Sequence, residues 1–186
     1  MIQLSILIPT TYDRLVITNR LVNTLLMQIG NHKVEVITLY DNREKTTGQK
    51  RNELIEMAKG KYTVFFDSDD EPKPTYISSI LKAIESDPDV IPINGYMSTN
   101  GNGANFWDMG LGFGYGVKQL NGIQVYDRFP NHIAAMKKEL IKDFKFLNVT
   151  VGEDYEWAKR INDAGVLKTE VRITEKIYHY KFVENK

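Results

Sequence analysis

Acidic residues follow directly after an apolar segment, residues 62–66, that is typical of a buried strand. The segment after it reads Asp67-Ser68-Asp69-Asp70-Glu71. Carboxylates this close repel one another unless a cation or solvent lies between them. Divalent cations such as Mg²⁺ and Mn²⁺ prefer these oxygen ligands, together with phosphate groups of a substrate. The segment therefore indicates a Mn²⁺ or Mg²⁺ site centred on Asp69, or else a solvated acidic turn before the next helix.

Arg51 is the second candidate, near the start of a helix expected over residues 48–59. The apolar residues Leu54 and Ile55 follow it by three and four positions, so Arg51 falls on the inward face of that helix. An inward arginine needs an anion, and the N-terminus of a helix also favours anions. We expect Arg51 to face either a bound diphosphate or an acid of the protein itself (Glu53, Glu56 or a loop residue).

Asp154 is the third candidate, at the start of a helix expected over residues 153–164. It precedes apolar residues by three, four and seven positions (Trp157, Ala158, Ile161), which places its carboxylate on the packing face. The helix dipole is sufficient to explain Glu153 beside it, but it explains an inward Asp154 less well. A carboxylate held in a cleft is a candidate general base.

Alternating strands and helices must position these residues. Strands are expected over 4–8, 34–40, 62–66 and 90–94, and helices over 22–29, 48–59 and 74–86. This order indicates βαβ units and a largely parallel sheet. Ligands of such sheets bind beyond the carboxyl ends of the strands, where Pro9, Thr10, Tyr12, Asp41 and the acidic segment converge.

The second half of the chain reads differently. Residues 95–116 hold seven of the thirteen glycines and lack periodicity, so we expect a long loop there. Strands over 123–126, 133–136 and 167–173 and helices over 137–143 and 153–164 are expected to follow, before an aromatic tail. The expected fold is a single α/β domain, with a parallel front half and a mixed back half.

Composition narrows the function classes. The 186 residues include 24 basic and 24 acidic side chains, and 42% are hydrophobic, which is ordinary for a globular domain. Zero net charge argues against general nucleic-acid binding, and the absence of cysteine excludes disulfides and thiolate chemistry. No apolar run approaches the roughly 20 residues that span a bilayer, and the first residues lack a signal-peptide pattern. We therefore expect a cytoplasmic protein with no transmembrane segment.

In this order, these segments resemble the family 2 glycosyltransferases, which have the nucleotide-sugar-binding GT-A fold. The segments that carry the resemblance are 4–10, 48–52, 58–62, 66–70 and Glu153-Asp154 with Arg160 and Gly165. The resemblance covers nearly the whole chain. It implies a single Rossmann-like GT-A domain over 1–186, with a nucleotide-sugar-binding half (1–95) and an acceptor-side, catalytic half (96–186).

The resemblance also implies an inverting, metal-assisted enzyme whose donor is a nucleotide-diphosphate sugar, expected to be UDP-linked. The donor would be bound by Pro9, Thr10, Tyr12, Asp41, Gly48, Arg51, Asp67 and Ser68. Within this set, Thr10, Tyr12 and Asp41 would face the base and ribose, and Arg51 the diphosphate. Asp154 would be the catalytic base, and the cation would lie on Asp69 with help from His179.

Departures from the family pattern limit these expectations. Only Asp41 of the usual acidic segment after the second strand is retained, because Asn42-Arg43-Glu44-Lys45 replaces the rest. The Gln/Arg-x-x-Arg-Trp motif of processive synthases is missing, so we expect transfer of one sugar rather than polymerisation. The acceptor, a hydroxyl compound of open identity, would be recognised by the back half or by a partner subunit in a homo-oligomer.

Other functions stay open on these residues. A strand that ends in Asp67-x-Asp69 also fits a haloacid dehalogenase-type phosphatase, although two strand–helix units precede it here. A nucleotidyltransferase shares the fold and the metal chemistry, but the helix that starts at Glu153-Asp154 argues against it. The third alternative is a module that binds nucleotide sugars without turning them over.

Several aromatic residues and histidines have two interpretations each. The segment 95–116 carries Trp107 among other aromatics, so it forms either a lid over a sugar and acceptor pocket or a fixed loop that completes the core. His132 and Glu153 are further candidates for that pocket. The histidines (His32, His132, His179) are otherwise structural residues, and His32 is expected in a turn.

Overall fold

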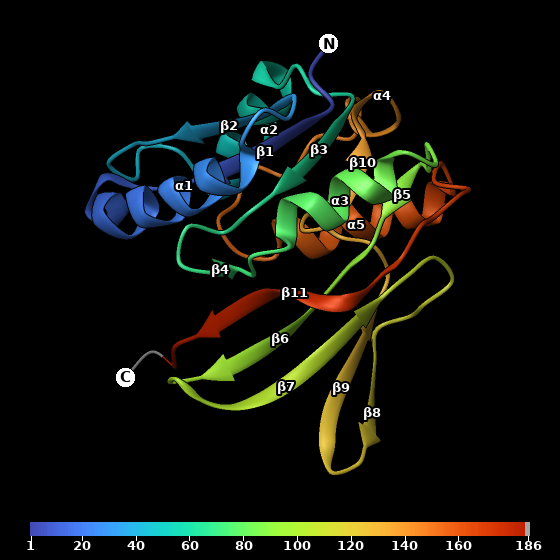
Figure 1. The fold of residues 1–186 in the computed structure, drawn as a ribbon. Coiled ribbons are helices and arrows are strands. Elements are labelled where there is room, and N and C mark those ends of the chain that lie inside the picture. Colours follow the sequence, from blue (N-terminus) through green and yellow to red (C-terminus); the bar gives the residue numbers. More distant parts are fainter. Residues whose placement is uncertain (185–186) are drawn as a thin grey trace.

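Two β-sheets form the framework of the protein, and the computed structural model describes residues 1–184 of it (Figure 1). The first sheet contains, in spatial order, β2 (Val34–Leu39), β1 (Leu4–Pro9), β3 (Tyr62–Phe65), β10 (Ala135–Lys137) and β5 (Val90–Ile91). The second contains β4 (Glu71–Pro72), β11 (Ile173–Phe182), β6 (Ile93–Thr99), β7 (Asn102–Met109), β9 (Ile123–Arg128) and β8 (Gly116–Leu120). The helices are η1 (Tyr12–Arg14), α1 (Leu15–Ile29), α2 (Thr47–Met57), α3 (Tyr76–Ile84), α4 (Lys138–Ile141) and α5 (Glu153–Ala164).

The first sheet confirms the parallel front half. Strand β1 pairs in parallel with both β2 and β3, so that Leu4 lies opposite Val34 and Tyr62. Every residue of β1 is buried, because helices pack around this part of the sheet (upper part of Figure 1). The parallel order brings the carboxyl ends of the three strands to one edge, as the sequence predicted.

Some expected boundaries shift for local reasons. Helix α1 begins at Leu15, seven positions before the predicted start at 22. The strand expected over 90–94 is divided between the sheets at Pro92, with β5 before it and β6 after it. Proline has no N–H group to donate to a ladder, so it marks the point where the chain changes sheets. The helix expected over 137–143 is reduced to α4.

The prediction of a long loop over residues 95–116 is wrong. Strand β6 pairs antiparallel with β7, and only residues 110–115 of this segment lie outside strands and the β6–β7 turn. Asn100 and Gly101, with φ of 51° and 77°, form the two-residue turn between them, and Asn121-Gly122 joins β8 to β9 in the same way (φ 52° and 77°). Asn-Gly pairs favour such hairpin turns because both residues tolerate positive φ. Here glycine marks tight turns within a sheet, not an open loop.

The prediction of a strand over residues 167–173 is also wrong for most of this segment. Only Glu170 forms an isolated bridge, to Val90, before β11 begins at Ile173. The backbone N–H groups of Lys168 and Thr169 donate instead to the Asp89 carboxylate, which diverts this segment from strand pairing. The aromatic tail is in fact the long strand β11, which lies between β4 and β6.

Aromatic packing joins the two sheets. The ring of Phe66, just after β3, lies 4.4 Å from the ring of Tyr178 on β11, measured between centroids, and both side chains are buried. Tyr76 of α3 packs against Phe66 from another side. This contact sets the second sheet beneath the edge where the parallel strands end.

Within residues 1–184, no helix has the length and apolarity needed to cross a bilayer. Residues 185 and 186 of the expected domain lie outside the described part.

Candidate active site

A cavity of about 570 Å³ lies between the carboxyl edge of the first sheet and the face of the second. Its polar end is formed by Asp67, Asp70, His132 and Asp154. All five aromatic residues that line the cavity come from the second sheet (Trp107, Tyr126, Tyr178, Tyr180, Phe182), and Met97, Thr99, Asn105 and Arg128 of the same sheet lie among them. Of the residues predicted for a sugar and acceptor pocket, Trp107 and His132 line this cavity, whereas Glu153 is buried behind it.

Five charged or polar side chains form a continuous chain at the polar end. Arg51 Nη2 donates to Asp67 Oδ1 at 3.1 Å, and Arg51 Nη1 lies 3.6 Å from Glu153 Oε1. His132 Nε2 lies 3.3 Å from Asp67 Oδ2, and His132 Nδ1 lies 3.4 Å from Asp154 Oδ2. The sequence named all five residues, but it did not predict that they contact one another.

Arg51 is enclosed by protein. Its side chain is 4% exposed, and its guanidinium lies over the rings of Phe65 and Phe146, at 5.3 Å and 5.5 Å from their centroids. Its anionic partners here are Asp67 and Glu153, so the structure contains the pairing with protein acids that the sequence left open. A contact between Arg51 and a diphosphate stays a prediction.

The acidic residues after β3 have unequal surroundings. Asp70 accepts hydrogen bonds from Tyr178 OH at 2.6 Å and from the Lys181 N–H at 2.9 Å, and burial, followed by the charge of Asp67, raises the pKa of Asp70 to about 8. Burial by itself would raise the pKa of Asp67, but His132 and Arg51 hold it well below its usual range. Asp67 is therefore ionised at neutral pH.

Asp69 has the most open carboxylate of this cluster's aspartates. Its side chain is 42% exposed, and its protein partner is Arg14, whose Nη1 lies 3.2 Å from Asp69 Oδ2. The same nitrogen donates to the hydroxyl of Ser68 at 3.4 Å. Arg14, which was not among the residues predicted from the sequence, therefore places a half-exposed guanidinium group beside the acidic turn.

The donor set fits a divalent cation only when a ligand supplies further oxygens. Within residues 1–184, no three acidic or histidine side chains converge closely enough to hold a metal ion by themselves. Asp67 and Asp70 are each engaged by two neighbouring groups, which leaves Asp69 as the available carboxylate. Mg²⁺ in particular is often bound by one or two carboxylates together with substrate phosphates, and this cluster suits that arrangement.

His179, the second predicted metal ligand, lies on β11 opposite Glu71. Its ring stacks on Tyr96 with centroids 4.3 Å apart. Nε2 shares a hydrogen bond with Ser98 Oγ at 2.8 Å, and Nδ1 lies 3.5 Å from Glu71 Oε2. These contacts agree with a structural histidine, and its role as a metal ligand stays a prediction.

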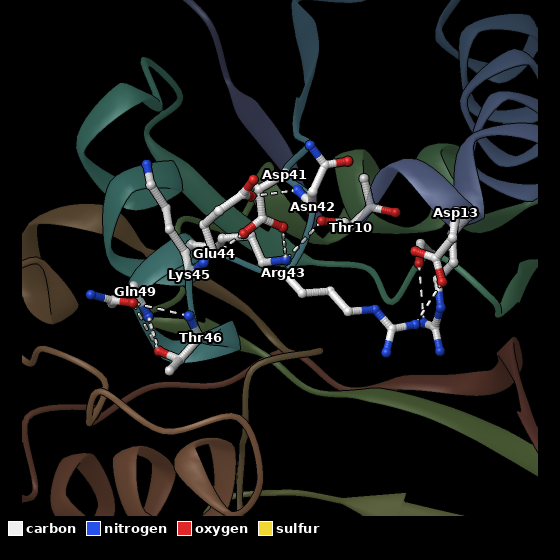
Figure 2. A network of polar contacts seen from close by, with 12 residues as sticks. Thr10, Asp13, Asp41, Asn42, Arg43, Glu44, Lys45, Thr46 and Gln49 are labelled. Carbon is white, nitrogen blue, oxygen red and sulfur yellow. Dashed lines mark hydrogen bonds and ion pairs between the residues drawn. The ribbon is translucent and has the colours of Figure 1, made fainter.

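The loops after β1 and β2 are tied together at the predicted nucleotide side. Arg43, after β2, reaches the carboxylate of Asp13 in η1, with 2.6 Å between Nη2 and Oδ2 (Figure 2). Tyr12 is exposed and stacks on Tyr40, with ring centroids 5.5 Å apart. Thr10 is buried at the end of β1, and its hydroxyl shares a hydrogen bond with Thr18. Pro9 is the last residue of β1.

Lys50 is a buried residue of this site that the sequence argument missed. Its Nζ donates to Asp41 Oδ1 at 2.6 Å and to the carbonyl oxygen of Thr10 at 2.8 Å. The backbone N–H of Lys45 donates to the other oxygen of Asp41. Lys50 precedes Leu54 by four positions, which is the helical spacing that also places Arg51 on the inward face of α2.

Gly48 allows a close backbone approach at the start of α2. Its N–H donates to the carbonyl oxygen of Val149 at 3.1 Å, and a Cβ at Gly48 would overlap the carbonyl oxygen of Leu147. The Thr46 hydroxyl accepts from the Gln49 N–H, and the Thr46 N–H donates to the side-chain oxygen of Gln49, which completes a capping box (Figure 2). These N–H groups are satisfied by protein, so a contact from Gly48 to the donor stays a prediction.

The architecture, a parallel α/β sheet joined to a mixed sheet around one polar cavity, is that of a GT-A fold. The family model described as "Glycosyl transferase family 2" matches residues 17–145. The chain therefore belongs to glycosyl transferase family 2, as its resemblance implied. This membership favours glycosyl transfer over the phosphatase and nucleotidyltransferase alternatives. The match ends before α5, so the assignment of Asp154 depends on geometry.

Solved structures of Staphylococcus aureus TarS share the fold. The chain is similar to TarS 1–349 in complex with UDP (TM-score 0.68, 17% identity, 97% of this chain and 60% of that one). It is also similar to TarS 1–349 in complex with UDP-GlcNAc (TM-score 0.68, 16% identity, 100% and 60%), and to TarS itself (TM-score 0.67, 17% identity, 97% and 37%). The chain thus spans about 60% of the length of the first two. No curated protein matches the chain.

Proposed function

We propose that this protein transfers one sugar from a UDP-linked nucleotide sugar to an acceptor hydroxyl, with inversion at the anomeric carbon. The observation that carries the proposal is the position of Asp154. Its side chain is 36% exposed at the polar end of the cavity, and it is linked through His132 to Asp67 in the acidic turn. Membership of family 2 supports the reaction class, and the complexes of TarS with UDP and UDP-GlcNAc support the donor class.

The chemistry requires a base on the side opposite the leaving group. Asp154 removes the proton of the acceptor hydroxyl while the hydroxyl oxygen attacks the anomeric carbon. The bond from that carbon to the diphosphate oxygen breaks, and its electron pair leaves with the nucleotide diphosphate. Because attack and departure occur on opposite faces, the configuration inverts and no enzyme nucleophile is needed.

Charge on the departing diphosphate must be compensated. A Mn²⁺ or Mg²⁺ ion, when bound to Asp69 and the donor phosphates, would neutralise part of that charge. Arg14, beside Asp69, is positioned to contact the same phosphates. Arg51 supports the site by holding Asp67 and Glu153, and its predicted contact with the diphosphate requires that one of these pairs opens.

The nucleotide itself would lie along the edge where β1 and β2 end. Tyr12 offers an exposed ring for the base, and Thr10 and Asp41 lie at the strand ends where a ribose would bind. Asp67 and Ser68 continue this edge toward the cavity. The acceptor would occupy the aromatic part of the cavity, where the faces of Trp107 and Tyr126 suit the apolar faces of a sugar ring.

Binding and turnover test this proposal in sequence. Thermal shift and calorimetry with UDP, GDP and UDP-sugars, each with and without Mn²⁺, identify the donor, because a ligand of the native state raises the melting temperature. Incubation with the tightest-binding UDP-sugar and a panel of hydroxyl acceptors then measures transfer by release of UDP. We expect UDP to bind more tightly with Mn²⁺ and a UDP-sugar to turn over. Binding without turnover would favour the non-catalytic module, and no binding of any nucleotide diphosphate would reject the site.

A further inference from the structure

His132 occupies a fixed position between the donor side and the acceptor side of the cavity. It lies in the connection from β9 to β10, and its side chain is 8% exposed. Its carbonyl oxygen accepts a hydrogen bond from the Phe65 N–H at 3.0 Å, which anchors its backbone to β3. Asn131 beside it accepts from the N–H groups of Ile133 and Ala134. The imidazole therefore has little freedom to move.

Each ring nitrogen of His132 faces one carboxylate. Nε2 lies 3.3 Å from Asp67 Oδ2, and Nδ1 lies 3.4 Å from Asp154 Oδ2. The Nδ1 atom is buried and has no completed hydrogen bond, although Asp154 is within ion-pair distance. A buried nitrogen without a partner is costly, so it favours an approach of the Asp154 carboxylate. Catalytic hydrogen bonds are often long in the free enzyme and shorten in the complex.

We propose that His132 is the positioning residue of the catalytic base, holding one oxygen of Asp154 so that the other faces the acceptor hydroxyl. The inference rests on the proposed function, in which Asp154 takes the proton. Both ring nitrogens of His132 face carboxylates of the protein, so the ring orients Asp154 and does not replace it as the base.

The need for such a holder follows from the position of Asp154. It is the second residue of α5, more than a third exposed, so its carboxylate can rotate toward solvent if nothing holds it. The charged groups near His132 are Asp154 and Glu153 from α5 and Asp67 just after β3, which Arg51 of α2 in turn holds. The carboxylate of the base is thereby tied to the rigid parallel sheet.

A double-mutant cycle tests this role. We expect His132→Ala to lower kcat about ten- to a hundredfold, the scale of a misplaced catalytic group, with the KM of the donor changed less than about threefold. In an Asp154→Asn background, His132→Ala should lower kcat no further than about twofold, because both changes disable the same group. His132→Gln keeps one donor and should recover part of the loss. His32→Ala, at an exposed histidine, is the matched control and should leave kcat unchanged.

Three results would overturn the proposal: independent, additive losses in the cycle, a loss confined to donor affinity, or unchanged kcat.

NMR of the histidine side chains provides a readout that does not need activity. The ring resonances of His132 should shift in Asp154→Asn but not in Asp163→Asn, at an exposed acid near the end of the same helix. If the ring resonances of His132 do not shift in Asp154→Asn, the pairing of His132 with Asp154 is rejected, whether or not the protein transfers a sugar. Shifted resonances in a protein without transfer would reject the proposed function alone.

Discussion

Lys50 and Asp41 form an ion pair that is almost completely removed from solvent, with 5% and 8% of their side chains exposed and 2.6 Å between Nζ and Oδ1. Because Lys50 also donates to the carbonyl oxygen of Thr10, one ammonium group connects α2 to the ends of β1 and β2. The edge of the sheet at which we place the nucleotide is therefore held by a buried charge. Removal of either partner would leave the other charge uncompensated.

The first prediction concerns Asp41→Asn. We expect it to lower the free energy of unfolding at pH 7 by about 3 kcal/mol, the scale for a broken buried ion pair. Burial alone would raise the pKa of Asp41, but hydrogen bonds from Lys50 and the Lys45 N–H hold it below its ordinary value. The stabilisation is thus fully present above about pH 4, the pKa of an unfolded aspartate, and is lost as the pH falls through the lower, folded pKa.

Urea unfolding of parent and variant at pH 7 and near pH 3 measures this difference. The gap between the two proteins should narrow at the lower pH. Asp163→Asn, which removes a surface ion pair with Lys159, is the control and should change stability little at either pH. An equal gap at both pH values would show that Asp41 does not contribute through its charge.

The second prediction separates chemistry from donor binding. Asp154→Asn should lower turnover by at least about a hundredfold, the lower range for general-base catalysis, with little change in the affinity for UDP. Glu153→Gln should reduce turnover less, because Glu153 is buried against Arg51 behind the cavity. Steady-state kinetics and calorimetry check both. Equal losses of turnover in the two variants would remove Asp154 from its role as the base.

The third prediction concerns the cation. Asp69→Asn should abolish Mn²⁺-dependent binding of UDP while the melting temperature without ligand stays near that of the parent, since Asp69 is half exposed and has one surface ion pair. Calorimetry with and without Mn²⁺ measures the effect, again with Asp163→Asn as the control. Tight, Mn²⁺-dependent binding of UDP by Asp69→Asn would mean that the metal site is elsewhere.

The fourth prediction uses the contact between two strands of the second sheet. Gly95 of β6 lies opposite Trp107 of β7, and a Cβ on Gly95 would overlap the indole ring. Gly95→Ala should therefore destabilise the protein by about 1–3 kcal/mol, the usual range for overpacking, and should alter tryptophan fluorescence. Gly114→Ala is the control, since a Cβ there meets no atom within 4 Å. An unchanged stability of Gly95→Ala would contradict this packing.

The fifth prediction concerns residues 95–116, for which the sequence left open a lid or a fixed segment. Because β6 is hydrogen-bonded to β11 on one side and β7 on the other, its amides should exchange slowly in the protein without any ligand. Residues 110–115 should exchange faster. Hydrogen exchange with mass spectrometry measures both segments. Fast exchange of β6 that slows only when UDP and Mn²⁺ are added would restore the lid hypothesis.

The sequence predicted the front half well because its signals are local. The apolar run around Ile6 and the polar residues after it define a strand and its end without reference to the rest of the chain. The same holds for α5, where Gly165 marks the C-terminus in a left-handed conformation. The alternation of strands and helices then indicated a parallel arrangement, which the pairing of β1 with β2 and β3 confirms.

The second sheet was harder to predict because its signals conflict. Gly95 is a packing residue inside a strand, while Gly101 and Gly122 are turn residues, and glycine content alone does not separate the two uses. The Asn-Gly pairs were the available signal, and they predict hairpins. For the site, helical spacing placed Arg51 inward but could not identify its partner. That partner, Asp67, is a neighbour only in three dimensions.

The place of β11 in the second sheet has a consequence for how the chain folds. This strand lies between β4 and β6, so residues about 80 to 108 positions apart must pair before the sheet is complete. Such distant pairing makes folding slow, and a nascent chain that stops near residue 170 would present the unpaired edge of β6 to other molecules. The cavity lining that β11 supplies (Tyr178, Tyr180, Phe182) therefore takes its place only after β4 and β6 have both been synthesised.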